Sequence, residues 1–215
     1  MEPSLTGFVD QFCAAQAHRT RQAEDATRDA MIQPNVYWTL LAPFVTVVGL
    51  YTNVPEGGEV AADQAAWLRG ELAAAPVGAT LIVTLHHPIY SADAHHGGSA
   101  RMGAVLDQAV AAAGRWPDLV VMGHVHNYQR FTRRVAGREV PNIVNGAGGY
   151  WHLHAVAKGA DGGRLPVPWA VPGMDVTLEQ NCDDWHGFLR LDVTAGTIRG
   201  RYRSVPRPQE SWRAG

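Results

Sequence analysis

Ten histidines are spread over the 215 residues, and six of them fall between positions 86 and 126. His86 and His87 directly follow the apolar run TLIVTL. His124 directly follows the apolar run LVVMG, and His126 comes two residues later. Both runs are typical of β-strands that are buried on both faces. Because ligands of open α/β sheets bind outside the carboxyl ends of the strands, we expect these imidazoles to converge at one edge of a sheet.

Imidazole is a common ligand of zinc, iron and copper, so the two clusters indicate a metal site. In a strand, residues i and i+2 point to the same face, so His124 and His126 would lie side by side. His95 and His96 lie in the loop after the first cluster, where imidazoles suit the capture of an anion or the protonation of a leaving group. The alternatives without chemistry are surface histidines in a turn and a solvated polar loop.

The segments that must position these histidines alternate between strands and helices. Segments 36–41 and 44–51 predict adjacent strands, and segments 61–75 and 100–114 predict helices, the second bounded by Ser99 and Gly114. Together with the two histidine-tipped runs, they predict an α/β sheet with helical cover. Residues 8–32 indicate an irregular helical segment, the stretch 157–184 is rich in loops, and four further segments predict strands: QRFTRRV, PNIVNGAGG, GFLRLDV and TIRGRYRSV.

Composition and charge argue against several classes of protein. The net charge of −2 does not indicate a basic surface for binding nucleic acid. No apolar run approaches the length of about 20 residues that a helix needs to cross a bilayer. The N-terminus lacks the basic and apolar regions of a secretory signal as written. Cys13 and Cys182 do not make a disulfide framework, and the length suits a single domain over residues 1–215.

Two segments, LHHPIYSADAHH and VVMGHVHNYQRF, resemble the last two motifs of the calcineurin-like metallophosphoesterases, in the branch that includes the purple acid phosphatases. In that branch a histidine at a strand end is followed nine and ten residues later by a His-His pair. His86 is followed at these offsets by His95 and His96. The later motif is matched by Gly123, His124, His126, Tyr128 and Arg130, with Gln129 where the family usually has an acidic residue.

The resemblance implies a calcineurin-like four-layer α-β-β-α sandwich and a hydrolase of phosphoric esters with a dinuclear centre of iron, zinc or manganese. It implies that His86 and His124 hold one ion and that His126 holds the other. It also implies that His95 and His96 bind the phosphate ester substrate and are the candidates for the general acid.

The first half of the family's site has no counterpart in this sequence. The family pattern begins with Asp-x-His, Gly-Asp and Gly-Asn-His, and neither Gly-Asp nor Asn-His occurs here. Asp93-Ala94-His95 and Asp184-Trp185-His186 do not follow an N-terminal strand, so we interpret both as chance matches. We therefore expect an N-terminally truncated domain that holds at most about one tight ion and is inactive or weakly active alone.

Two alternatives remain open. The first is a non-catalytic or degenerate metal-binding fragment that needs a missing N-terminal part or a partner chain. The second is an unrelated histidine metal enzyme. A cupin would have a Glu a few residues after H-x-H, but the next acidic residue here is Glu139. An amidohydrolase barrel would have its H-x-H near the start of the chain. We also expect the missing strands to leave a sheet edge uncovered beside TLIVTL and LVVMG, open to self-association.

Overall fold

Two groups of strands are present in the computed structural model, which describes residues 5–13, 33, 35–52 and 57–205. The first group consists of β1 (Trp38–Ala42), β2 (Val45–Gly49), β3 (Thr80–Leu85), β4 (Leu119–Met122), β5 (Tyr128–Val135), β6 (Arg138–Asn145), β7 (Trp169–Ala170) and β8 (Val176–Cys182). The second consists of β9 (Gly187–Thr194) and β10 (Thr197–Ser204). The described helices are α1 (Thr6–Phe12), α2 (Ala62–Ala74) and α3 (Ala100–Ala113). None of them is long and apolar enough to cross a membrane.

The first group forms one mixed sheet in the order β1-β2-β3-β4-β6-β5-β8-β7, and β9 and β10 form a separate hairpin. At the centre of the sheet, β2, β3 and β4 pair in parallel, with α2 and α3 as the crossovers between them. β1 is the antiparallel partner of β2. This order confirms the predicted α/β sheet, the hairpin at its start and the two helices.

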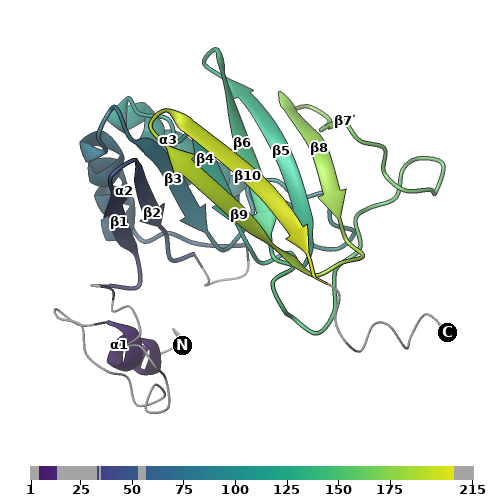
Figure 1. Ribbon diagram of the computed structural model, residues 1–215, viewed down its shortest axis with the longest axis horizontal. Helices are drawn as coiled ribbons and strands as arrows, with labels where there is room; N and C mark the ends of the chain where they lie inside the picture. Colours follow the sequence, from purple (N-terminus) through teal and green to yellow (C-terminus); the bar gives the residue numbers. More distant parts are fainter. Residues whose placement is uncertain (1–4, 14–32, 34, 53–56, 206–215) are drawn as a thin grey trace.

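Side chains alternate between the two faces of the central strands, and each face has its own cover. One cluster joins the first face to the helices and includes Leu81, Val83, Val120, Leu68 and Leu106. A second cluster joins the opposite face to the hairpin and includes Ile82, Leu119, Ile143, Leu189 and Ile198. Figure 1 shows the hairpin crossing in front of the sheet, with the helices behind it. Helices, sheet and hairpin are three of the four layers that the resemblance implied.

Local sequence explains how the helices are held. The Ser99 hydroxyl accepts a hydrogen bond from the backbone N–H of Met102 at 3.3 Å, and Gly114 takes the left-handed conformation, with φ of 67°, that ends α3. Gln64 of α2 is buried, and its amide pairs with the N–H and the carbonyl of Tyr51 at 2.8 and 2.9 Å. This pair ties α2 to the segment that leaves β2.

The prediction of an uncovered sheet edge beside TLIVTL and LVVMG is wrong. β3 lies between β2 and β4, and β4 lies between β3 and β6, so neither borders an uncovered edge. The physical reason is that β6, a strand from later in the chain, pairs in parallel with β4 and occupies that edge. The stretch 157–184 also contains β7 and β8, which pair beside β5. Of the predicted helical segment 8–32, the part after residue 13 lies outside the described residues.

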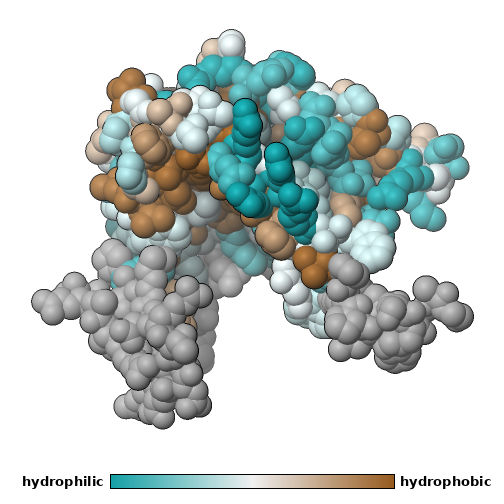
Figure 2. Space-filling view, viewed as in Figure 1, coloured by the Kyte–Doolittle hydropathy of each residue, from teal (hydrophilic) through white to brown (hydrophobic). Residues whose placement is uncertain are grey.

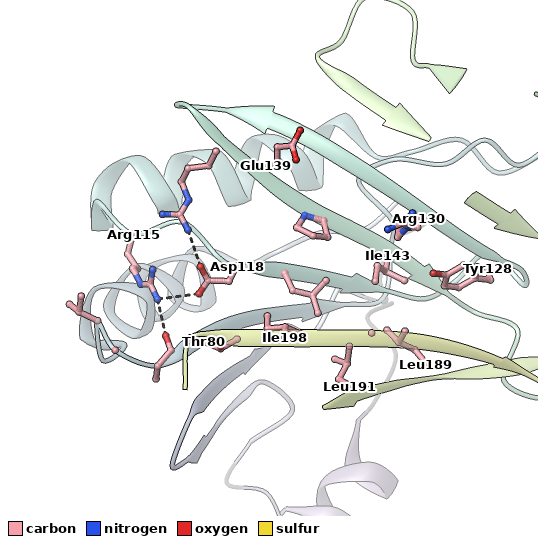
Figure 3. Close-up of a pocket in the computed structure, with 18 residues that line it drawn as sticks. Thr80, Arg115, Asp118, Tyr128, Arg130, Glu139, Ile143, Leu189, Leu191 and Ile198 are labelled. Atoms are coloured by element: carbon pink, nitrogen blue, oxygen red, sulfur yellow. Dashed lines mark hydrogen bonds and ion pairs between the residues drawn. The ribbon is translucent and has the colours of Figure 1, made fainter. Parts of the chain in front are cut away.

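A groove of about 750 Å3 separates the sheet from the hairpin (Figure 3). Within it, the carboxylate of Asp118 pairs with Arg115 at 3.3 Å and with Arg138 at 2.9 Å. Asp118 also accepts a hydrogen bond from the N–H of Leu81 at 2.8 Å, so these charges join the amino ends of the central strands. The groove therefore lies at the opposite end of the strands from the histidines.

Candidate functional site

The histidines after β3 and β4 meet as predicted. Leu85 and Met122 are paired residues at the carboxyl ends of these parallel strands, so the residues that follow them leave the sheet side by side. Nε2 of His86 lies 3.1 Å from Nδ1 of His124. One of the two rings must donate the hydrogen in this contact, because two lone pairs would repel each other.

This short separation suits a metal ion. Two imidazole nitrogens on one tetrahedral zinc ion lie about 3.3 Å apart, given zinc–nitrogen bonds of about 2.0–2.1 Å. An ion could therefore bind between His86 and His124 with little change in the distance between the two nitrogens. His124 has a φ of 64°, a left-handed conformation that is costly for a residue with a side chain and that concentrates at functional sites.

His87 completes this first group, although the sequence analysis assigned it no role. A nitrogen from each of His86, His87 and His124 lies within 4.8 Å of the others. The buried hydroxyl of Thr52 lies 3.4 Å from Nδ1 of His87 and accepts the backbone N–H groups of His86 and His87 at 3.1 and 3.2 Å. Thr52 therefore fixes the backbone of the strand end.

The loop that carries His95 and His96 is organised by a buried carboxylate. Oδ1 of Asp93 accepts the backbone N–H groups of His95 and His96 at 2.9 and 2.7 Å, and it lies 3.1 Å from Nδ1 of His96. Because an ionised carboxylate only accepts, we assign the hydrogen to Nδ1 of His96, which leaves Nε2 for a ligand. Asp93 thus holds the loop of this candidate site in place.

A buried amide network connects this loop to the segment after β4. Gln129 accepts the N–H of Ala92 at 2.7 Å and donates to Oδ1 of Asn127 at 2.8 Å. Asn127 in turn donates to the carbonyl of His154 at 3.0 Å and lies 3.5 Å from Oδ2 of Asp93. Asn127 and Gln129 are both fully buried, so the network is a rigid internal support.

His126 and His124 belong to two different groups of potential metal ligands. β4 ends at Met122 and the chain turns at His124, so the rule that residues i and i+2 share a face does not apply. The ring of His126 instead packs on His154, with ring centroids 4.1 Å apart, and a nitrogen from each of His126, His152 and His154 lies within 4.8 Å of the others. The two imidazoles of this motif therefore belong to different ligand groups, although His124 is near enough to His126 to lower its pKa electrostatically.

Burial sets the protonation of this second group. Desolvation lowers the pKa of His126 below 6.5, and the nearby rings of His154 and His152 lower it further. Desolvation also lowers the pKa of His154, although the carboxylate of Asp93 opposes this shift. Both rings are therefore neutral at pH 7, which is the form that binds a metal ion.

The other predicted residues have different places. His95 is exposed, and together with His87, His96 and His124 it lines a hollow of about 230 Å3. Tyr128 faces the hairpin, where its ring stacks on that of Tyr202 with centroids 4.2 Å apart.

His152 and His154 are the residues that sequence reasoning missed. They form a second H-x-H pattern after the Gly-rich segment 146–149, and this spacing was the available signal. His152 is exposed, whereas the backbone N–H of His154 donates to the carbonyl of His126 at 3.0 Å.

Comparisons with known proteins agree with this geometry. None of the protein-family models matches the chain. Purple acid phosphatase 21 of Arabidopsis thaliana is 32% identical over 106 residues, which are 48% of this chain and 23% of that protein. The purple acid phosphatase PPD1 from yellow lupin (Lupinus luteus) seeds superposes with a TM-score of 0.60 at 15% identity, covering 90% of this chain and 36% of that one.

A second solved structure, "GAP50 the anchor in the inner membrane complex of Plasmodium", has a TM-score of 0.55 at 17% identity and covers 85% of this chain and 56% of that one. The chain thus spans about a quarter of its curated relative and about a third of PPD1. It has the fold of the purple acid phosphatases, and its resemblance to their branch of the calcineurin-like metallophosphoesterases is confirmed.

The role of Asp93 predicts the effect of its replacement by asparagine. Asp93→Asn keeps an oxygen for the backbone N–H groups but removes the charge that holds the hydrogen on Nδ1 of His96. We expect the tautomers of His96 to shift toward Nε2–H, and metal affinity to fall about 10–100-fold. Long-range 1H–15N spectra and zinc titration would measure the two effects. Asp161→Asn, on an exposed loop, is the matched control, and an unchanged His96 tautomer would contradict the assignment.

The lowered pKa values predict a pH dependence of the metal-free chain. His126 and His154 should gain protons only below pH 6.5, whereas in the urea-unfolded chain they should titrate near the ordinary value of 6.5. The unfolded state then binds more protons just below pH 6.5, so the free energy of unfolding should fall as the pH drops through that window. NMR titration and urea melts would test this, and a midpoint above 6.5 for either folded-state ring would refute it.

Proposed function

We propose that this chain carries the histidine half of a metal-dependent phosphoric ester hydrolase with a dinuclear metal centre. The observation that carries the proposal is the convergence of His86, His124 and His96 at the carboxyl ends of β3 and β4. The rings of His96 and His124 lie 5.6 Å apart, edge to face, so a group held at one ring lies within reach of the other. The fold and the sequence similarity to purple acid phosphatases support the reaction class.

The residues present suit a transition-metal ion. His86 and His124 would hold one ion, with iron, zinc or manganese as the candidate metals, and their nitrogens already have the spacing of two ligands. By the resemblance, His126 would hold the other ion. Bound ions of this kind polarise a phosphoryl oxygen and stabilise the charge that develops during hydrolysis.

We assign the phosphate of the substrate to His95 and His96. His96 presents Nε2 to the hollow while Asp93 holds its other nitrogen, so a protonated His96 would donate to a phosphate oxygen from a fixed position. His95 is exposed, but its backbone is held by the same carboxylate. A positioned imidazole of this kind is also suited to protonate a leaving group, which is the role we propose for one of the pair.

The alternative is a metal-binding protein without catalysis. The sequence contains neither Gly-Asp nor Asn-His, so the family's carboxylate and asparagine ligands have no motif here. GAP50, which shares the fold, is described as an anchor. The two functions differ in one measurable respect, because a non-catalytic protein would bind metal but would neither capture phosphate in the hollow nor turn over an ester.

The first test is therefore hydrolysis of p-nitrophenyl phosphate, with binding of inorganic phosphate, by the chain supplied with Zn2+, Mn2+ or Fe2+. We expect metal-dependent phosphate binding with slow turnover, because only histidine ligands are in place. His124→Ala should abolish both, and His96→Ala should weaken phosphate binding by about tenfold or more, since a charge-assisted hydrogen bond contributes about 1.5–3 kcal/mol.

Arg101→Ala removes an exposed positive charge at the start of α3 and is the control for non-specific binding of anions. Metal binding without phosphate binding or turnover would contradict the proposal and favour the non-catalytic alternative. Rapid turnover that depends on His124 would instead show that the site in this chain is complete.

We also propose self-association of the chain, and the exposed strand β1 supports this edge of the sheet as the contact. This strand is one of the two outermost strands among the described residues, and Leu41 on it is 71% exposed. Leu40 and Phe44 are also exposed, and Figure 2 shows hydrophobic surface on the side of the molecule where β1 and β2 lie. An exposed apolar edge strand is a template for pairing with another copy.

Leu41→Lys should therefore lower the apparent mass at high protein concentration in size-exclusion chromatography and sedimentation, because lysine blocks edge pairing. Val77→Lys, at a 92% exposed loop position, is the matched control and should change nothing. A monomeric chain at all concentrations would contradict self-association, as would equal effects of the two substitutions.

A further inference from the structure

We propose that His126, His152 and His154 form a transition-metal site of their own, beside the pair of His86 and His124, and that it takes a zinc-like divalent ion through imidazoles alone. His152 and His154 belong to neither of the two histidine motifs that carry the resemblance. The chain would then bind two ions, one more than the sequence motifs supported. This inference rests on the proposed function in one respect, because it supplies further ligands for the ion assigned there to His126, but it does not require hydrolysis of a phosphate ester.

The geometry of the three rings is close to that of a ligand set. The ring centroids of His126 and His154 lie 4.1 Å apart, those of His152 and His154 lie 5.4 Å apart, and those of His126 and His152 lie 6.0 Å apart. One nitrogen from each ring lies within 4.8 Å of the others, against about 3.3 Å on a tetrahedral zinc ion. Closure needs a shift of at most about 1.5 Å, and the exposed His152 is the ring that can make it.

A buried nitrogen without a hydrogen-bond partner supports the proposed metal site. Nδ1 of His126 is buried and has no hydrogen-bond partner among the described residues. A buried polar atom without a partner is unfavourable, so in folded proteins such an atom is usually met by another group, by water or by an ion. An ion bound by His152 and His154 would lie against the ring of His126 and could satisfy this nitrogen.

The second ligand is already held in place by backbone contacts. The carbonyl of His126 accepts the N–H of His154, and Asn127 donates to the carbonyl of His154, both at 3.0 Å. Two residues further on, the N–H of Val156 donates to Asp183 at 2.8 Å. The positions of His126 and His154 are thus fixed before an ion binds, and only the ring of His152 must move toward the other two.

Asp93 supplies the charge that three neutral imidazoles lack. Its Oδ2 lies 3.8 Å from Nδ1 of His154, and that nitrogen also receives the N–H of His126 at a long 3.3 Å. At this distance the carboxylate makes no hydrogen bond with His154, so it acts through its negative charge, which attracts a cation held by the three imidazoles. Asp93 also holds His96, whose ring stacks on that of His154 at 4.6 Å, so one carboxylate serves the two neighbouring sites.

Aromatic packing is the competing explanation for this cluster. Tyr150 lies 4.2 Å from His126 and Trp151 lies 4.0 Å from His152, measured between ring centroids. Packing alone would leave the three histidines with no affinity for metal. It would also leave the buried nitrogen of His126 unexplained.

The test is zinc titration of the whole chain by calorimetry, with Co2+ as a spectroscopic probe of the ligand geometry. We expect two zinc ions per wild-type chain. His152→Ala and His154→Ala should each remove one ion or weaken its binding at least tenfold. His124→Ala should remove the other ion, and His95→Ala, a nearby histidine outside every ligand group, should keep both.

His152 is exposed, so His152→Ala tests the site even where His154→Ala does not fold. A single ion that is lost in His124→Ala and unaffected by His152→Ala would overturn the proposal, as would no zinc binding at all. Phosphate binding by the same variants separates the two proposals. Loss of phosphate binding with both ions retained would count against the phosphoesterase alone.

Discussion

The buried carboxylate of Asp93 is the interaction on which the candidate site depends. Its side chain is fully buried, yet it accepts two backbone N–H groups and contacts the rings of His96 and His154. An ionised carboxylate in such a place is tolerated only when its oxygens are fully used. That requirement forces the loop after β3 to close tightly around Asp93 and brings two histidine segments, distant in sequence, into one cluster.

The parallel strands β3 and β4 determine where the histidine segments around this carboxylate leave the sheet. β3 and β4 end at the same edge, so the chain must leave the sheet there twice, once before each histidine segment. The turn after β4 is sharp enough to place His124 in a left-handed conformation. Such strain persists only where the surroundings hold it, and here Thr52, Asn127 and Gln129 hold the adjoining segments from beneath.

Successive side chains of the motif that follows β4 lie on opposite faces of the sheet. Tyr128 packs on Tyr202 and secures the hairpin, whereas the next residue, Gln129, turns to the other face and joins the amide network under the histidines. Gln129 replaces an acidic residue of the family. An amide at this position can accept from Ala92 and donate to Asn127 at once, which an ionised carboxylate cannot do.

The sequence by itself determined the central strands, the two helices between them and the convergence of His86 and His124, because these follow from local periodicity, capping and the rule for parallel strands. It did not determine that β6 would occupy the edge beside β4, since pairing between distant strands depends on the whole chain. Only the tertiary structure assigned His126 and His124 to different ligand groups, because a left-handed turn cannot be read from an H-x-H spacing. It also decided the places of Asp93, His152 and His154, whose roles come from contacts between loops rather than from any local pattern.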